Sequence, residues 1–227
     1  IKLVIARYEE DINWSNNFLS NRIIYNKGSD NLQCPHLKLK NIGNEGNTYL
    51  EHIINNYDNL SDYTIFSQGS LFDNHVNINN VNEYDINYLI NSSSILYNCN
   101  IKYIGLNSSK RRLQKWNGWN EFDNFEDPCH IYGKKELQKC LKNLYSKYNK
   151  NIILDSSNNF KIICNYCGFF LVHKNCILKH NKEFYINLNE DLKKDKLVGY
   201  ALERLWGSIF CPPVSYTHLR AHETEAY

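Results

Sequence analysis

Apolar and polar positions along the chain predict short buried strands separated by amphipathic helices. Lys2–Tyr8 reads KLVIARY, an apolar and β-branched run typical of a buried strand. Leu50, Ile53 and Tyr57 lie at i, i+3 and i+7, which is the spacing of a helix with one buried face. The same patterns predict further strands at Arg22–Tyr25, Tyr63–Phe66, Ile101–Leu106 and within Phe160–Val172. They predict further helices at Trp14–Phe18, Val81–Ile90, Leu137–Tyr148, Glu183–Leu192 and Val198–Phe210.

The order of these elements indicates the fold class. Strands that alternate with helices predict an α/β fold, with a mostly parallel central sheet and helices on both faces. No internal repeat and no Pro/Gly-rich linker divides the chain, so we expect a single domain. Asn44 or Asn47 is the expected N-cap of the helix that contains Leu50. Residues 29–40 and 107–132 lack periodicity and are predicted as loops, the second of them long.

Composition and charge exclude several classes of function. The formal net charge of the 227-residue chain is +2, so no nucleic-acid partner is predicted. No run approaches the roughly 20 apolar residues that cross a bilayer, so no membrane span is expected. The 8 cysteines are scattered, and a domain of this length needs no disulfide staples, which indicates reduced thiols and a cytoplasmic protein. The chain begins at Ile1 inside a predicted strand, so a preceding signal or anchor stays an open alternative.

The C-terminal segment differs from the rest of the chain. Val214–Thr224 reads VSYTHLRAHET, which resembles the translation of a common transposase-type sequencing adapter. We therefore expect residues 1–213 to form the domain and residues 214–227 to be an artefactual tail. The histidines of this tail are not candidates for a metal site.

The chain lacks the signatures of several common enzyme classes. It contains no G-x-G-x-x-G, no G-x-x-x-x-G-K-[ST], no G-x-S-x-G and no H-E-x-x-H. Polar clusters stand instead at the ends of predicted elements, starting at Arg7, Tyr25, Asn41 and Gln68. Turn and capping chemistry explains any one of them, but ligands of open α/β sheets bind beyond the carboxyl ends of the strands. Together the clusters favour a binding site there, for a phosphorylated or nucleotide ligand.

Five stretches of the chain resemble a family of proteins that share a domain of unknown function. They read VIARYEEDINW, IIYNKG, NIGNEGNTYLEHIINNYDNL, YTIFSQG and, far downstream, ERLWGSIF. This family has the motifs A-R-Y-N-E-D, I-Y-N-K-G, N-x-G-R-E-x-x-T-Y-L and E-R-L-W, and it is similar to nucleotide-sugar glycosyltransferases of the GT-A type. The resemblance implies a GT-A-like, Rossmann-like fold. It also implies an enzyme that moves a sugar from a nucleotide-sugar donor to an unknown acceptor.

Carried over residue by residue, the resemblance implies a donor site at the carboxyl edge of the sheet. The residues of this site are Arg7, Tyr8, Glu10, Asn26, Lys27, Asn41, Gly43, Glu45, Gln68 and Gly69. Glu203 and Arg204 of the terminal motif are the catalytic candidates. Glu203 is the expected general base, although a salt bridge with Arg204 explains that carboxylate equally well. By residue type, Trp116 and Trp119 offer faces on which an acceptor sugar can stack, or else they anchor the loop in the core.

Departures from the family motifs leave a second function open. Asn44 stands where the family has Arg, which removes a clamp for phosphate. The Asp-x-Asp with which GT-A enzymes commonly hold a divalent cation is missing from the chain, and Asp73 and His75 are the substitute ligands for Mn or Mg. The alternative is a non-catalytic domain of the same fold that binds a glycan or a protein partner.

A group of cysteines and histidines superficially resembles a zinc site. Its members are Cys164, Cys167, His173, Cys176 and His180. Cys164 and Cys167, however, lie inside an apolar, strand-like run rather than on a polar knuckle. Buried thiols are therefore expected here, and no zinc.

Overall fold

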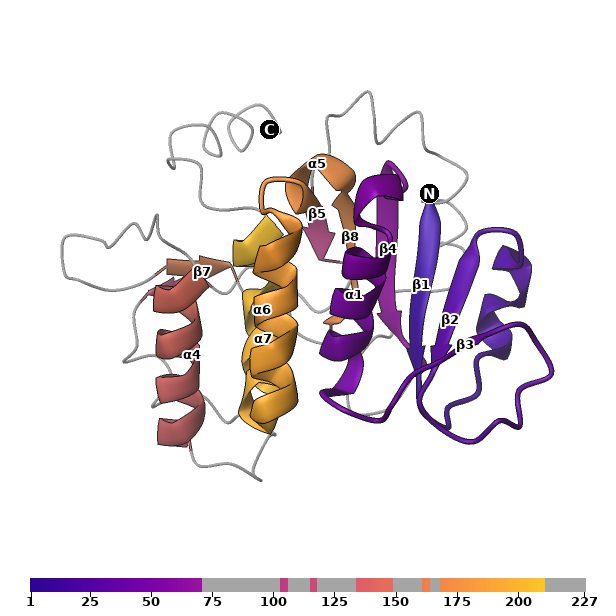
Figure 1. Cartoon of the computed structure of the whole chain (residues 1–227), viewed down its shortest axis with the longest axis horizontal. Coiled ribbons are helices and arrows are strands. Elements are labelled where there is room, and N and C mark those ends of the chain that lie inside the picture. Colours follow the sequence, from indigo (N-terminus) through magenta and orange to yellow (C-terminus); the bar gives the residue numbers. More distant parts are fainter. Residues whose placement is uncertain (71–102, 106–114, 118–133, 149–160, 164–167, 211–227) are drawn as a thin grey trace, which may run out of the picture.

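The computed structural model describes residues 1–70, 103–105, 115–117, 134–148, 161–163 and 168–210 (Figure 1). The strands of the main sheet are β1 (Lys2–Arg7), β2 (Arg22–Asn26), β3 (Leu37–Lys38), β4 (Tyr63–Gln68), β5 (Tyr103–Gly105) and β8 (Phe170–His173). A separate pair consists of β6 (Lys115–Asn117) and β7 (Lys161–Ile163). The α-helices are α1 (Asn44–Asn55), α4 (Lys134–Tyr148), α5 (Lys174–Ile177), α6 (Lys182–Lys194) and α7 (Lys196–Phe210). Two 3₁₀-helices, η1 (Asn13–Phe18) and η2 (Tyr57–Asn59), complete the described elements.

The main sheet has the strand order β3-β2-β1-β4-β8-β5. β1 pairs in parallel with β2 and with β4, and β2 pairs in parallel with β3. β8 is antiparallel to both β4 and β5, so within this sheet it alone runs against the other strands. The prediction of a mixed α/β fold with a mostly parallel sheet is therefore confirmed. The chain passes to one side of β1 to form β2 and to the other side to form β4, which makes the carboxyl ends of β1 and β4 a topological switch point.

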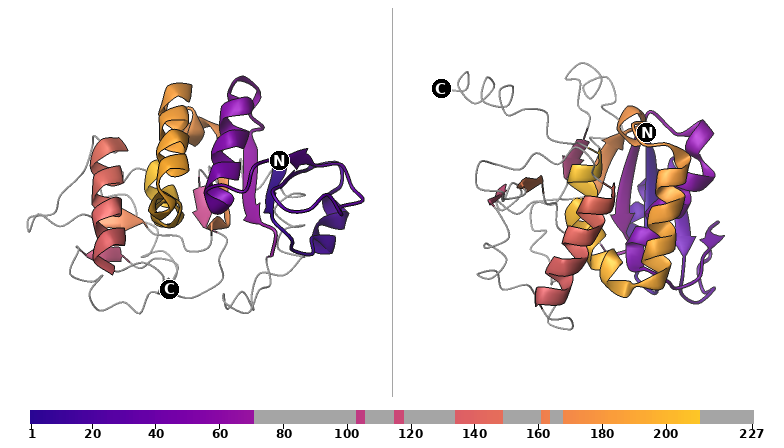
Figure 2. Two further views of the ribbon diagram at one scale, coloured as in Figure 1. Left: turned by 60° about the horizontal axis from the view of Figure 1, so that its bottom comes forward. Right: turned by 60° about the vertical axis from the view of Figure 1, so that its left-hand side comes forward.

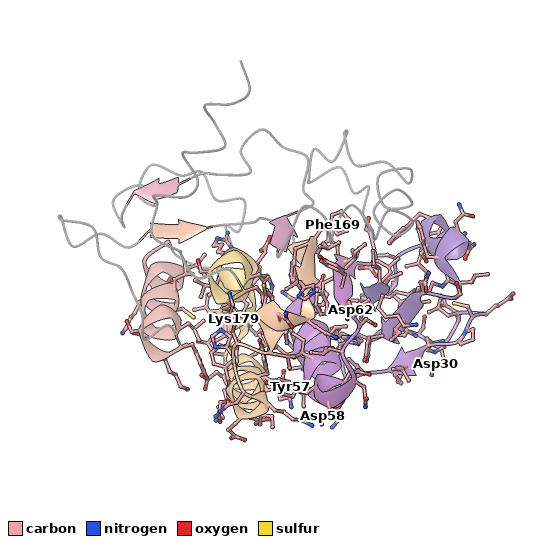
Figure 3. All side chains as sticks on the ribbon, turned by 90° about the horizontal axis from the view of Figure 1, so that it is seen from above. Asp30, Tyr57, Asp58, Asp62, Phe169 and Lys179 are labelled. Carbon is pink, nitrogen blue, oxygen red and sulfur yellow. The ribbon has the colours of Figure 1, made fainter. Side chains whose placement is uncertain are left out.

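The two faces of the sheet are buried in different ways. Because successive side chains of a strand point to opposite faces, Val4 belongs to the core cluster that includes residues of α1, α4, α6 and α7, whereas Leu3 belongs to the cluster that includes Phe18 of η1. The helices form one layer on the first face, as the views in Figures 1 and 2 show. Phe169 lies on the other face, away from α1 (Figure 3). In the described part of the chain the second face is thus covered by a 3₁₀-helix, and the helix predicted at Val81–Ile90 lies outside the described residues.

The start of α1 differs from the prediction. Gly43, rather than Asn44 or Asn47, is the N-cap, and no side chain makes a capping hydrogen bond. The reason is that Gly43 adopts a left-handed backbone conformation, with φ 62°, so the turn itself leads into the helix. The Asn47 side chain instead donates a hydrogen bond to Asn189 Oδ1 of α6 at 2.8 Å.

Two short strands lie in segments that were predicted as loops. β3 occurs within residues 29–40 and β6 within residues 107–132. Each of them forms because it pairs with another strand: β3 pairs with β2, and β6 pairs with β7. Neither has a hydrophobic period of its own. The loop prediction is therefore wrong at these positions, because periodicity cannot reveal a strand of two or three residues.

His52 is a buried titratable group on the sheet-facing side of α1. Its ring lies edge-on to Tyr25 of β2 and to Phe66 of β4, and its Nδ1 is 3.1 Å from the Tyr25 hydroxyl oxygen. Burial, and after it the positive charge of Lys2, lowers the pKa of His52 from 6.5 to about 4. Between these two pH values the unfolded chain binds a proton that the folded chain does not.

We expect this histidine to weaken the fold in acid. Its stabilisation is fully present above pH 6.5 and is lost as the pH falls to about 4, which costs about 3 kcal/mol in the free energy of unfolding. Urea denaturation of the wild type and of His52→Gln at a series of pH values measures the effect, and the variant should show the flatter pH dependence. Asn55→Gln, at an exposed side chain of the same helix that does not titrate, is the control and should keep the wild-type slope. Equal slopes for the wild type and His52→Gln would contradict the prediction.

Candidate functional site

Three parallel strands end at one edge of the sheet, each with a polar residue. Arg7 is the last residue of β1 and Asn26 the last of β2, and the two are register partners. Gln68 ends β4, where its neighbour Ala6 on β1 is the register partner, and its side-chain amide donates to the Ser70 carbonyl at 3.0 Å. Parallel pairing thus brings these three predicted donor-site residues to the same edge.

Arg7 connects the loops that follow β1 and β2. Its Nε donates to the Glu10 carbonyl at 3.0 Å, and its Nη1 donates to Asn26 Oδ1 at 2.8 Å. Nη1 also donates to the Tyr8 carbonyl at 3.1 Å, and Nη2 donates to Asn31 Oδ1 at 3.1 Å. A guanidinium has five N–H donors, so the protein itself takes up most of them. The contacts show a buried arginine that positions both loops.

The loop after β1 also contacts the end of β4. The Trp14 indole N–H donates to the Gly69 carbonyl at 2.9 Å, and the Tyr8 amide donates to Glu10 Oε2 at 2.6 Å. A Cβ added to Gly69 would stand 2.7 Å from Glu10 Oε2, so the Glu10 carboxylate lies directly against Gly69. Tyr8 extends outward and is 50% exposed. The edge therefore presents a carboxylate and an accessible aromatic ring two positions apart in the chain.

Lys27, the residue after β2, holds the turn that precedes α1. Its side chain is buried, and its Nζ donates to the Ile42 carbonyl at 2.7 Å and to the Asn44 carbonyl. Burial lowers the pKa of Lys27 to about 8, against the attraction of Glu45 and Glu51. The ammonium group is thus engaged with the backbone of the turn and leaves one N–H donor unassigned by these contacts.

The turn itself has a left-handed backbone at two successive positions. Gly43 has φ 62° and Asn44 has φ 48°. Asparagine is among the few side chains that adopt this region readily. A Cβ at Gly43 would stand 2.7 Å from Leu192 Cγ of α6, so only glycine fits between the turn and that helix. The geometry of this turn places Glu45 in the first turn of α1.

Glu45 and Glu203 are brought together where α1 meets α7. Burial, and next the negative charge of Glu203, raises the pKa of Glu45 to about 7. A backbone hydrogen bond and the positive charge of Lys27 oppose this rise, and Glu10 adds a smaller increase. By its accessible surface Glu45 is only half-buried, so its carboxyl group is both closely surrounded by protein and reachable from solvent. A carboxyl group that titrates near neutrality can act as a general acid or base.

The two catalytic candidates of α7 have different environments. The Glu203 side chain is 20% exposed, and its Oε2 lies 3.5 Å from Arg204 Nη1. Arg204 is buried, and its Nη1 also donates to the Tyr200 carbonyl of the same helix at 2.7 Å. Arg204 is therefore in contact with its own helix and with Glu203, as the salt-bridge alternative anticipated.

Other predicted site residues lie away from this cluster or outside the described residues. Asn41 is exposed, two residues before the left-handed turn. Trp116 belongs to β6, of which only the backbone is described. Trp119, Asp73 and His75 lie outside the described residues, so acceptor stacking and metal binding stay predictions.

Sequence reasoning missed Gly168, which stands next to Glu45. It has φ 53°, and a Cβ there would meet Glu45 Cγ at 3.1 Å and Glu45 Oε1 at 3.4 Å. Its carbonyl accepts a hydrogen bond from the Tyr49 hydroxyl at 2.8 Å. No signal in the sequence marks this glycine, because its partners are on a helix more than 100 positions earlier in the chain.

The described members of the cysteine and histidine group have other contacts. His173 accepts a hydrogen bond from the Asn175 amide at 3.1 Å through Nδ1. His180 Nε2 is 3.0 Å from the Ile209 carbonyl oxygen, and Cys176 is buried in the core. Cys164 and Cys167 lie outside the described residues. Within the described ranges no group of three or more His, Cys, Asp and Glu side chains is placed to hold a metal ion.

A cavity of the described part lies away from the carboxyl edge, between α4, α6 and α7. Apolar side chains such as Leu144, Leu188 and Leu205 line it, and none of the predicted site residues does. The convergence at the sheet edge is therefore a cluster of contacts rather than a described pocket.

The comparisons with known proteins connect the chain with a family and with no known activity. None of the described helices is long and apolar enough to cross a membrane. No curated protein and no solved structure matches the chain. The range matched by the family covers nearly the whole chain and includes part of residues 214–227, whose artefactual origin stays a prediction. The chain belongs to the family described as Protein of unknown function (DUF3431), which matches residues 3–224.

Proposed function

We propose that this protein is a glycosyltransferase-like enzyme that moves a sugar from a nucleotide-sugar donor to the hydroxyl group of an acceptor. The observation that carries the proposal is the meeting of four distant segments at the carboxyl edge of the sheet. The loop after β1 contributes Glu10, the loop after β2 contributes Lys27, the first turn of α1 contributes Glu45, and α7 contributes Glu203. A ligand site at this edge requires charged side chains from several segments to converge there.

The sheet topology supports a nucleotide as the donor. The order β3-β2-β1-β4 places a switch point at the ends of β1 and β4, where nucleotides bind in open α/β sheets. Tyr8 follows β1 directly and is half exposed, so its ring is available to stack on a base. Together with the resemblance of the motifs to GT-A enzymes, this favours a nucleotide sugar over other phosphorylated ligands.

A divalent cation is not needed to state the reaction. Mn and Mg prefer oxygen ligands, and Glu10, Glu45 and Glu203 are of that type. Among the described residues no group of His, Cys, Asp and Glu side chains is placed to hold a metal ion, and the predicted ligands Asp73 and His75 lie outside them, so the cation stays a prediction. The proposed transfer is therefore argued from the carboxyl groups alone.

One observation favours the alternative of a non-catalytic binding domain. Arg7 and Lys27 are cations at this edge, and backbone carbonyls and Asn side chains already occupy most of their donors. A leaving diphosphate would need such donors to stabilise its charge. If these cations are purely structural, the same edge binds a neutral glycan without transferring it.

Thermal unfolding with a panel of ligands distinguishes the two functions. We expect UDP-glucose, UDP-N-acetylglucosamine or GDP-mannose, measured with and without Mn²⁺, to raise Tm in a concentration-dependent way. Tyr8→Ala should abolish that rise, because the exposed ring is lost while little stability depends on it. Leu178→Ala is the matched control, since Leu178 is also exposed but follows α5 at the opposite edge of the sheet, and it should keep the full rise.

The outcomes of this panel are unambiguous. If no nucleotide sugar raises Tm and neutral oligosaccharides do raise it, the protein is the non-catalytic binding domain instead. A nucleotide-induced rise that survives Tyr8→Ala would place the donor site elsewhere in the chain.

A further inference from the structure

The first turn of α1 is enclosed by α7. A Cβ added to Gly199 would stand 3.8 Å from Asn44 Nδ2, and one added to Gly46 would stand 3.7 Å from Leu202 Cδ1 and 3.9 Å from Trp206 Cζ2. The face of α7 that carries these residues also carries Glu203, one turn before Trp206. Asn44 and Gly46, the two neighbours of Glu45 in the chain, therefore lie against this face.

Gly168 and Tyr49 define the position of the Glu45 side chain. The backbone of Gly168 lies so close to Glu45 that even a methyl group there would press on its Cγ, at 3.1 Å. The hydrogen bond from the Tyr49 hydroxyl to the Gly168 carbonyl, at 2.8 Å, holds that backbone in place. Tyr49 lies on α1 one turn after Glu45, so the helix that carries the carboxyl group also carries its support.

The charges around Glu45 come from three sides. The charges that act on it are those of Glu203 on α7, Lys27 at the end of β2 and Glu10 in the loop after β1. α6 contributes the apolar Leu192 to the same turn, and Gly168, two residues before β8, contributes uncharged backbone. The negative charge of Glu203 disfavours ionisation of Glu45, whereas the positive charge of Lys27 favours it.

Two polar atoms without a partner indicate that a ligand hydroxyl belongs here. Trp206 Nε1 and Thr48 Oγ1 are buried and make no hydrogen bond with any described residue. The ring edge of Trp206 lies beside the first turn of α1, because Cζ2 is attached to the carbon that bears Nε1. Thr48 follows Glu45 by three positions and so shares its side of α1. A carboxylate can accept a hydrogen bond from an uncharged hydroxyl, and the N–H and O–H groups can donate to the oxygen of that hydroxyl. A phosphate is disfavoured, because the carboxylates repel its negative charge.

We propose that Glu45, rather than Glu203, takes the proton of the acceptor hydroxyl, that Glu203 is the second carboxyl of the pair, and that Tyr49 and Gly168 are positioning residues for Glu45. This inference rests on the proposed function. It also narrows the acceptor to a neutral, hydroxyl-bearing compound. It moves Glu45 from the donor site, where the resemblance put it, to the acceptor side of the reaction.

The transfer then balances without a further reactant. The acceptor oxygen forms a bond to the anomeric carbon of the donor sugar, while the bond from that carbon to the diphosphate oxygen breaks. The nucleoside diphosphate leaves with the electron pair of the broken bond. The proton of the acceptor hydroxyl moves to the Glu45 carboxylate, so Glu45 must be ionised at the start and the rate should rise with pH as it loses its own proton.

Replacing Glu203 distinguishes the two carboxyl groups. If Glu203 is the base, Glu203→Gln abolishes transfer at every pH. If Glu45 is the base, Glu203→Gln removes the like charge that helps to raise the pKa of Glu45, so activity is kept and its acid limb moves to lower pH. Glu45→Gln should then lower the rate about 100-fold or more at every pH.

The experiment has two arms on the full chain. Carboxyl ¹³C NMR of glutamate-labelled protein, titrated from pH 4 to 9, should show a glutamate with a pKa of about 7 that disappears in Glu45→Gln and moves down in Glu203→Gln. Release of nucleoside diphosphate from UDP-glucose, UDP-N-acetylglucosamine and GDP-mannose, with water in place of the acceptor, should show the corresponding pH profiles. Tyr49→Phe should lower the rate about tenfold while the nucleotide-induced rise in Tm stays unchanged, which a purely structural role would not produce.

Control variants keep the two proposals separable. Glu190→Gln, at an exposed position of α6, should change neither the pH profile nor the titration of Glu45. No glutamate titrating near neutrality, or one that Glu203→Gln leaves in place, would overturn the carboxyl pair. Absence of release from every nucleotide sugar would overturn the proposed function and the catalytic role of Glu45, while the NMR arm still decides whether the two carboxyls are paired. If Glu45→Gln fails to fold, Glu203→Gln still distinguishes the two bases. Loss of transfer at every pH identifies Glu203, whereas transfer that is kept with an acid limb at lower pH identifies Glu45.

Discussion

Replacing Gly28 with alanine is expected to lower the free energy of unfolding by about 3 kcal/mol or more. A Cβ at Gly28 would stand 1.5 Å from the Tyr8 carbonyl oxygen and 2.5 Å from the carbonyl carbon. These are backbone atoms of the loop after β1, so no side chain can rotate away to make room. The two loops would have to separate, and the contacts of Arg7 with Asn26 and with the Tyr8 carbonyl would be disturbed with them.

Gly46→Ala is the matched control for this prediction. Gly46 lies in α1, and the nearest atom to an added Cβ is Leu192 Cδ2 at 3.6 Å, an ordinary van der Waals distance. Because alanine has the higher helix propensity, this variant should gain up to about 1 kcal/mol. Urea denaturation followed by circular dichroism measures both. A Gly28→Ala protein as stable as the wild type would show that the loops do not approach each other as described.

Replacing Trp206 with alanine is expected to cost about 3–5 kcal/mol. Trp206 is buried on α7, and its ring stacks on Phe210 with centroids 5.7 Å apart and an interplanar angle of 6°. Its ring centroid is also 5.7 Å from that of Phe170 on β8 and 6.0 Å from that of Tyr49 on α1. The indole therefore joins the closing helix to the sheet and to the helix that carries Glu45. Truncation leaves a cavity among three elements that cannot collapse together.

Trp206→Phe separates the loss of packing from the loss of the indole N–H. No described residue accepts a hydrogen bond from that N–H, so its removal breaks none of the described hydrogen bonds. The phenyl ring keeps most of the stacking, and we expect a loss of about 1 kcal/mol. Thermal and urea unfolding of both variants provides the comparison. Similar losses for Trp206→Phe and Trp206→Ala would show that ring volume is not what Trp206 contributes.

Most of the regular structure follows from local pattern. The run KLVIARY predicted β1, and the spacing of Leu50, Ile53 and Tyr57 predicted α1, because burial of one face imposes a visible period on the sequence. The stripes that predicted the helices at Leu137–Tyr148 and Val198–Phe210 correspond to α4 and α7 for the same reason. The caps and the shortest strands escaped prediction, since a left-handed Gly43 and the pairing of β3 with β2 depend on contacts rather than on period.

The candidate site was predictable in part. Arg7, Asn26 and Gln68 were expected at one edge, and the parallel register of β1 with β2 and β4 puts them there. What their side chains contact was not predictable: Arg7 contacts loop carbonyls and amides. The motifs thus predicted that these residues share an edge, and the contacts indicate structural roles that the motifs did not.

By itself, then, the sequence determined the alternation of strands and helices, the mostly parallel sheet and the polar character of its carboxyl edge. These features depend on residues that are neighbours in the chain or that repeat with a fixed period. Only the tertiary structure decided that β8 runs against the other strands, that Gly168 supports Glu45, and that Glu203 approaches Glu45 from the last described helix. Each of these depends on burial shared by segments far apart in the chain, because the charge and the space around a carboxyl group are properties of everything packed against it and not of the residues beside it in the sequence.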